Sequence, residues 1–161
     1  MHEIRFLADD MVRRLARWLR TLGYDTYYAS RLSDDALAEI AEREDRVVLT
    51  RHAALAAKYP NLKIHVLQDE NPYVQLLDVV RRFCLDLESG LFTRCPVCNA
   101  LLEPIDKETH ADEIPERSYV AFDDFWRCAE CGRIYWEGSH VAKIRNQLRE
   151  LSALREKYQF Q

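Results

Sequence analysis

The sequence predicts an α/β protein in which a parallel sheet flanked by helices precedes a small cysteine-bearing module and a C-terminal helix. Strand-like and helix-like segments alternate four times within residues 1–90, the order expected when helices join parallel strands. Two Cys-x-x-Cys pairs follow in a segment with the texture of loops and short strands. From His140 to about Tyr158, apolar residues recur at helical spacing, which predicts one last helix.

The four predicted strands are short runs rich in apolar residues. They lie at residues 4–8, 25–29, 47–50 and 63–67. Because right-handed crossovers place a helix between successive parallel strands, this series implies one parallel sheet covered by helices.

A helix is predicted after each strand. Within residues 11–22, apolar side chains recur at helical spacing, and Gly23 is suited to end this helix. Ser33 or Asp34 caps the second helix. A short helix follows the third strand, and Pro72 opens a longer one after the fourth.

The chain of 161 residues has room for one ordinary domain and a small module. Its texture changes at Ser89-Gly90, so the predicted domains are 1–90 and 91–161. No apolar run approaches the length of a membrane span and the N-terminus lacks a signal-peptide pattern, which predicts a cytoplasmic protein with no membrane association. The net charge of −4 argues against coating nucleic acid through bulk charge but allows a local basic face.

Four of the five cysteines form the two Cys-x-x-Cys pairs. Each pair places two thiolates on one tight turn, where they can occupy adjacent corners of a tetrahedron around Zn²⁺. An odd number of cysteines without an export signal argues against a disulfide framework. Because four thiolates leave no position for water, we predict a structural zinc bound by Cys95, Cys98, Cys128 and Cys131. The fifth, Cys84, lies on the apolar face of a predicted helix and is expected to be buried.

Acidic residues gather where the predicted strands end, at the single edge that carries all carboxyl ends of a parallel sheet. Asp9 follows the first strand, Asp34 opens the second helix, and Asp69 follows the fourth strand, while His52 follows the third. Carboxylates converging in this way suit Mg²⁺ or Mn²⁺, which can activate water against a phosphodiester. Aspartate is also common at strand ends and helix caps for turn and dipole reasons, and the spacing favours neither interpretation.

Arginines are concentrated beside the same edge, because residues 11–20 contain four of them and no acid. Arg13, Arg17 and Arg20 share one helical face, and Arg51 flanks His52. The absence of balancing acids favours a phosphate-binding surface over a merely solvated helix face.

Several segments together resemble the Mut-seven C-terminal RNase-domain family, and the resemblance covers nearly the whole chain. The segments are FLADDM at 6–11, RLARWLR at 14–20, LGYDT at 22–26, VLTR at 48–51, RCPVCN at 94–99, FWRC at 125–128 and CGRIYWEGSH at 131–140. The resemblance implies a PIN-like nuclease domain fused to a zinc ribbon, in which acidic residues around Mg²⁺ or Mn²⁺ cleave RNA. It places Asp9 as the acid after the first strand and Asp34 (with Asp35 as its neighbouring candidate) as the acid opening the second helix. Asp69 lies about where the family has a fourth acid, after the fourth strand.

His52 departs from the family pattern, which reads Thr-Arg-Asp where this chain has Thr50-Arg51-His52. A second departure is Arg13, where the family usually has glycine. Imidazole offers a neutral nitrogen that Mg²⁺ binds poorly and Mn²⁺ or Zn²⁺ accepts, and it can also act as a general base. Three outcomes follow: altered metal preference, weak catalysis on three acids, or binding without catalysis.

The prediction is therefore a metal-dependent ribonuclease; the alternative is a catalytically inactive RNA- or protein-binding module on the same fold. The predicted catalytic set is Asp9, Asp34, His52 and Asp69, and the predicted phosphate-binding set is Arg14, Arg17, Arg20 and Arg51. The C-terminal helix is expected to pack onto the body of the protein or to bind a second copy or a protein partner.

Overall fold

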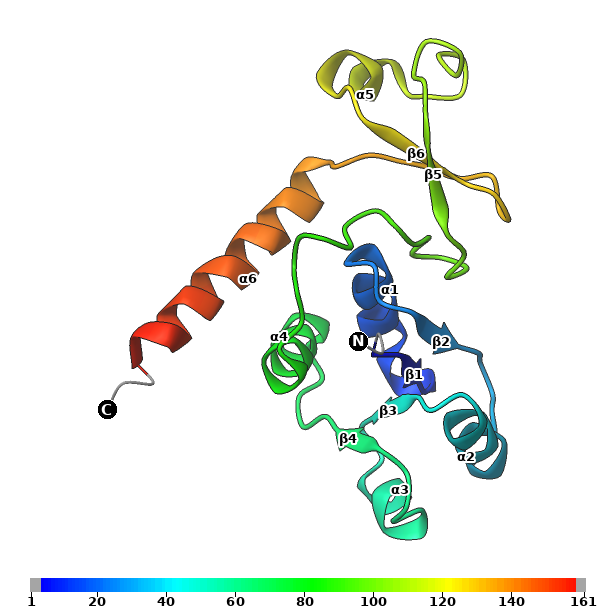
Figure 1. Cartoon of the computed structure of the whole chain (residues 1–161), viewed down its shortest axis with the longest axis vertical. Coiled ribbons are helices and arrows are strands. Elements are labelled where there is room, and N and C mark those ends of the chain that lie inside the picture. Colours follow the sequence, from blue (N-terminus) through cyan, green and yellow to red (C-terminus); the bar gives the residue numbers. More distant parts are fainter. Residues whose placement is uncertain (1–3, 159–161) are drawn as a thin grey trace.

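The computed structural model describes residues 4–158 and confirms the predicted fold class (Figure 1). A four-stranded parallel sheet with helices comes first, a three-stranded antiparallel sheet with the cysteine cluster follows, and a long helix ends the chain. In that part of the chain, no helix is long and apolar enough to cross a membrane.

The parallel sheet has the strand order β2-β1-β3-β4. Its strands are β1 (Phe6–Ala8), β2 (Thr26–Tyr28), β3 (Val47–Thr50) and β4 (Ile64–Val66). Every residue of the two central strands, β1 and β3, is buried, as expected for strands covered on both faces. The chain adds β2 on one side of β1 and then returns to add β3 on the other, so the topological switch point lies between β1 and β3.

Helices cover both faces of this sheet. They are α1 (Arg13–Thr21), α2 (Asp34–Arg43), α3 (Ala53–Lys58) and α4 (Pro72–Phe83). Residues of α1 and α4 pack with Phe6 and Leu49 on one face, whereas residues of α2 and α3 pack with Leu7 and Val48 on the other. The alternation of Phe6 and Leu7 between the two clusters is the two-residue period of a strand.

Two helix boundaries differ from the predictions. The first helix is preceded by a 3-10 turn, η1 (Asp10–Val12), because the Asp9 side chain accepts a hydrogen bond from the Met11 N–H. Helix α4 ends at Phe83 because Cys84 adopts a left-handed conformation, with φ of 51°. Cys84 is exposed there, so the prediction that it is buried is wrong.

The segment predicted to be a zinc ribbon contains β5 (Leu102–Ile105), α5 (Glu116–Ala121), β6 (Phe125–Cys128) and β7 (Ile134–Tyr135). Its strands form an antiparallel sheet in the order β5-β6-β7. The segment starts where Gly90 lies against the end of α1: a Cβ on Gly23, whose φ is +93°, would be only 2.1 Å from the Gly90 carbonyl oxygen. The domain division at residue 90 stays a prediction.

Helix α6 (Ser139–Tyr158) runs from the ribbon back past α4 (Figure 1). Leu148 of α6 is fully buried in the same core cluster as residues of α1 and α4. Arg149 forms an ion pair with Glu88. The expected packing of this helix onto the body of the protein is thereby confirmed, and a dimer or protein partner for it stays a prediction.

Candidate functional site

The four predicted zinc ligands come together. The Sγ atoms of Cys95, Cys98, Cys128 and Cys131 all lie within 4.8 Å of one another. The Cys98–Cys128 distance is 3.4 Å and the Cys95–Cys131 distance is 3.7 Å. In a tetrahedral site with Zn–S bonds of about 2.3 Å, neighbouring sulfurs lie about 3.8 Å apart, so this donor set fits Zn²⁺.

The two Cys-x-x-Cys turns have the same backbone design. Asn99 and Gly132, each directly after a second cysteine, have φ of 70° and 72°. Each N–H donates a 2.9 Å hydrogen bond to the carbonyl of the first cysteine of its pair, Cys95 or Cys128. The left-handed residue lets the chain turn back beneath the sulfurs, which points both thiols of a pair to the same side.

The first of these turns is attached to the parallel sheet. Arg20 of α1 donates hydrogen bonds to the carbonyls of Thr26 (2.8 Å), Val97 (2.9 Å) and Pro96 (3.3 Å). The Asn99 side-chain amide accepts from the Thr26 N–H at 3.1 Å and donates to Asp25 at 2.8 Å. The sequence pattern singled out neither contact of Asn99.

Arg20 therefore does not fit the phosphate-binding set in which the sequence placed it. Its side chain is only 5 % exposed, and its donors are used by carbonyls of β2 and of the turn between Cys95 and Cys98. Helical periodicity grouped Arg20 with Arg13 and Arg17, but the ribbon covers the end of that face. We leave Arg20 out of the RNA-binding residues proposed below.

Asp9 lies at the end of β1, beside the topological switch point. Its carboxylate accepts hydrogen bonds from the Thr50 hydroxyl and from the Met11 N–H (2.9 Å). Burial raises the pKa of Asp9 above its usual value, although the bonds from Thr50 and Met11 act in the opposite direction. A partly buried carboxylate with a raised pKa gains from a nearby cation, because the cation stabilises its charged form.

Thr50 links Asp9 to the residue that departs from the family pattern. The Thr50 hydroxyl oxygen accepts a 2.9 Å hydrogen bond from the His52 N–H while its hydrogen is donated to Asp9. The imidazole of His52 is exposed at the start of α3 and makes no capping bond. No role for Thr50 was predicted from the sequence, although the Thr-Arg motif after a buried strand was the available signal.

The two remaining predicted acids lie at the same edge but have partners of their own. Asp34, at the start of α2, is 3.6 Å from the Lys58 ammonium. Asp69 accepts a 2.7 Å hydrogen bond from the Asn71 N–H just before α4. Within the described residues, the cysteines are the only group of three or more His, Cys, Asp or Glu with ligand atoms close enough to share an ion.

The remaining arginines differ in their surroundings. Arg14 and Arg17 are exposed on α1, where both line a cavity of about 350 Å³. Arg51 forms a 2.8 Å ion pair with Glu70, and its buried Nε has no hydrogen-bond partner in the part of the chain that the structure describes. Arg14 and Arg17 are thus placed to meet a ligand, whereas Arg51 is paired with Glu70, the neighbour of Asp69 in the chain.

Of the segments quoted from the sequence, FLADDM and VLTR reach this edge, and RCPVCN, FWRC and CGRIYWEGSH carry the four clustered cysteines. No curated protein and no solved structure matches the chain. The family described as the Mut7-C RNAse domain matches residues 4–148, a range that spans both sheets and reaches into α6, and the chain belongs to this family.

Proposed function

We propose that the protein is a divalent-metal-dependent ribonuclease that hydrolyses RNA phosphodiester bonds. The observation that carries the proposal is the position of Asp9, a partly buried carboxylate at the switch point of a parallel sheet, in a chain of the Mut7-C RNAse domain family. Open α/β sheets bind ligands at this position. The exposed arginines of α1 follow Asp9 within one short turn.

The proposed catalytic ion is Mg²⁺ or Mn²⁺, with Asp9 as its principal protein ligand. Mg²⁺ in phosphate-processing sites is commonly held by one or two carboxylates, waters and substrate phosphates, so a cage of three protein ligands is not required. Such an ion lowers the pKa of bound water and offsets charge on the phosphodiester. Asp34 and Asp69 flank the site at the same edge, and the nitrogen of His52 favours Mn²⁺ over Mg²⁺.

The chain's own residues would then position the reactants. Thr50 and the Met11 N–H fix the orientation of the Asp9 carboxylate through two hydrogen bonds. Arg14 and Arg17 hold RNA phosphates along α1, and Arg51 holds one beside Asp69. The structural zinc maintains the ribbon that is docked against the other end of α1.

A catalytically inactive RNA-binding module is the second candidate. It is favoured by His52 at the expected acidic position and by the separate partners of Asp34 and Asp69. In this case the arginines of α1 and the ribbon would bind RNA, and the strand-end acids would serve as helix caps and ion-pair partners.

The test is cleavage of labelled single-stranded RNA by the purified protein in Mg²⁺ and in Mn²⁺. We compare the unmodified protein with Asp9→Asn, His52→Asp and the control Asp112→Asn, an exposed aspartate in the ribbon segment. We expect cleavage that is faster in Mn²⁺, a loss of at least about 100-fold in Asp9→Asn, and no change in Asp112→Asn. His52→Asp is expected to increase the rate in Mg²⁺.

Cleavage that survives Asp9→Asn would indicate a contaminating nuclease and contradict the assignment of Asp9. If the unmodified protein binds RNA and cleaves it in neither metal, while His52→Asp gains activity, the inactive module is the correct function of this chain.

A further inference from the structure

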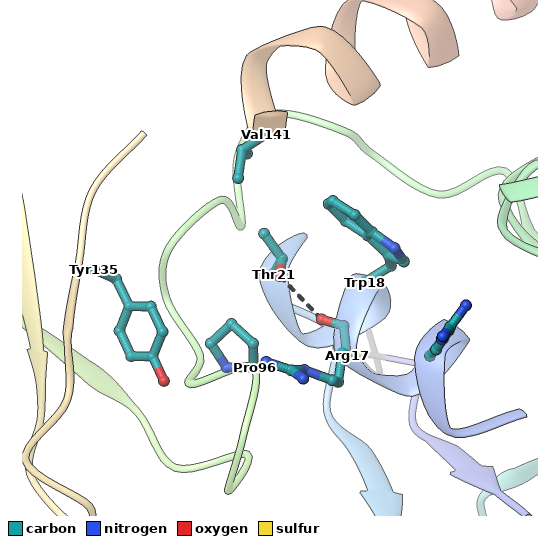
Figure 2. Close-up of a pocket in the computed structure, with 7 residues that line it drawn as sticks. Arg17, Trp18, Thr21, Pro96, Tyr135 and Val141 are labelled. Carbon is teal, nitrogen blue, oxygen red and sulfur yellow. Dashed lines mark hydrogen bonds between the residues drawn. The ribbon is translucent and has the colours of Figure 1, made fainter. Parts of the chain in front are cut away.

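A cavity of about 350 Å³ lies where α1 of the first domain, the ribbon segment and helix α6 meet. Its walls come from α1, from the turn between Cys95 and Cys98, from β7 and from the first turn of α6 (Figure 2). The volume is within the range of about 300–1,000 Å³ typical of small-molecule sites. The lining residues are Arg14, Arg17, Trp18, Thr21, Pro96, Tyr135 and Val141.

The interior of the cavity is mainly apolar and aromatic. Figure 2 shows Tyr135 on one side and Trp18 on the other, with Thr21 and Pro96 between them in this view. The Thr21 hydroxyl donates a 2.9 Å hydrogen bond to the Arg17 carbonyl, so this polar group is already satisfied. Aromatic rings on the walls of a cavity suit a flat, stackable ligand.

The Tyr135 wall is held in place by the zinc site. Its hydroxyl lies 3.1 Å from the Sγ of Cys95, so the zinc-ligating cluster fixes the position of the ring. The opposite wall belongs to α1, which Arg20 attaches to the same ribbon. The cavity is therefore formed before a ligand arrives, which reduces the ordering cost of binding.

Positive charge lies at the mouth of the cavity. Arg14 and Arg17 are exposed, and none of the ion pairs between the side chains that the structure describes involves either of them. Arg17 also lines a second hollow of about 110 Å³, together with Arg13 and Tyr28. The two hollows share Arg17 and Pro96, and the hydroxyl of Tyr28, which lines the second, lies 3.5 Å from the Asp10 carboxylate.

We propose that this cavity, the base pocket, receives one unpaired nucleobase of an RNA strand whose backbone phosphates are bound by Arg14 and Arg17. The identity of the occupant as RNA rests on the proposed function. Proteins read single-stranded RNA by stacking splayed bases on aromatic side chains beside basic residues, which is the combination found here. The base pocket therefore selects single-stranded over double-stranded RNA, because paired bases stay inside the duplex and cannot enter.

The experiment measures RNA binding without relying on cleavage. Full-length protein carrying Asp9→Asn is titrated against three fluorescein-labelled 12-nucleotide probes followed by anisotropy: a single strand, the same strand with abasic sugars, and a duplex. Val141→Trp replaces the lining valine by an indole that fills the base pocket and leaves Trp18, Tyr135 and both arginines in place. Arg14→Ala with Arg17→Ala removes the charge at its mouth, and Arg117→Ala, an exposed arginine on α5, is the matched control.

We expect the single strand to bind about tenfold more tightly than the abasic strand or the duplex, as stacking of one base predicts. Val141→Trp should remove this advantage and leave binding of the abasic strand unchanged. The double arginine variant should weaken all probes, and Arg117→Ala should weaken none. Zinc content and thermal unfolding are measured for each variant, and the comparison of probes on the unfilled pocket needs no folded Val141→Trp.

Equal binding of the normal and abasic strands overturns the proposal. So does a Val141→Trp variant that weakens both strands alike, since it would indicate a blocked backbone path instead of a base pocket. Failure to bind any RNA also overturns it. Base-dependent binding without RNA cleavage would support the base pocket and contradict the proposed ribonuclease activity, so the two proposals fail separately.

Discussion

The Arg20 guanidinium donates a 2.9 Å hydrogen bond to the carbonyl of Val97, which lies between Cys95 and Cys98 of the four-cysteine cluster. A helix that carries candidate RNA-binding arginines is thereby joined to a turn that carries two of the four clustered cysteines. The same guanidinium reaches the Thr26 carbonyl of β2, so one side chain joins the helix, the sheet and the ribbon. Three acceptors around one buried cation make Arg20 a structural residue of the junction.

Replacing Arg20 should therefore destabilise the protein, because the carbonyls that it binds lose their donor. Arg20→Ala leaves the carbonyls of Thr26, Pro96 and Val97 without this donor, at a cost of about 1–3 kcal/mol for each one that water cannot reach. We expect a loss of about 3 kcal/mol in urea unfolding. Arg20→Lys should recover only part of it, because an ammonium lacks the planar fork of a guanidinium.

Arg14→Ala on the exposed surface of the same helix is the control, and a change within about 0.5 kcal/mol is expected there. An Arg20→Ala protein as stable as the control would show that these hydrogen bonds contribute little.

The sequence anticipated what depends on local spacing. The Cys-x-x-Cys pairs, the strand ends and the helical stripe of α6 each follow from residues close together in the chain, and the structure bears out these elements. Helical periodicity, however, shows which residues share a face of α1 but not which face a distant segment covers. It therefore groups Arg20 with the exposed arginines. The loops from β2 to α2 and from β4 to α4 set how Asp34 and Asp69 point, and local patterns do not determine such loops.

Zinc removal should loosen more than the ribbon. Metal analysis of the purified protein is expected to find one Zn²⁺ per chain. Stripping it with a chelator should lower the thermal unfolding temperature, because the turn that accepts from Arg20 and carries Asn99, which is bonded to Asp25, loses its shape. Cys95→Ser with Cys128→Ser should bind no zinc, whereas Cys84→Ser, an exposed cysteine outside the cluster, should keep it. A zinc-free native protein, or a double variant of unchanged stability, would contradict the ribbon assignment.

Asp25 should contribute stability that disappears in acid. It pairs with Arg46 at 2.8 Å, and the two side chains are 17 % and 7 % exposed. Burial alone would raise the Asp25 pKa, but hydrogen bonds from Arg46 and Asn99 outweigh it and hold the pKa below the usual value. Because the folded-state pKa is below that of the unfolded chain (about 3.9), the stabilisation is present above that pH and is lost as pH falls toward the folded-state pKa.

Asp25→Asn is thus expected to cost about 2 kcal/mol at pH 7, since Arg46 loses one of its two carboxylate partners and keeps only Glu44. The difference in unfolding free energy between Asp25→Asn and the unmodified protein should narrow as pH falls below about 4. Urea unfolding at a series of pH values measures this difference. Loss of zinc in acid affects both proteins, so the difference between them isolates Asp25. A gap that stays constant with pH would show that Asp25 acts through packing and not through charge.

Thr50 should set the metal requirement of the proposed nuclease. Its fully buried hydroxyl donates to Asp9 and accepts from the His52 N–H, so removing it frees the carboxylate to rotate. Loss of a hydrogen bond to a metal ligand typically costs 10–100-fold in metal affinity or activity. In Thr50→Val we expect RNA cleavage to need at least about tenfold more Mg²⁺ or Mn²⁺ for half its maximal rate.

Thr50→Ser, which keeps the hydroxyl, separates this effect from packing and should restore the metal requirement of the unmodified protein. If serine fails to rescue, the buried methyl group is what matters; if Thr50→Val behaves like the unmodified protein, Thr50 does not position Asp9.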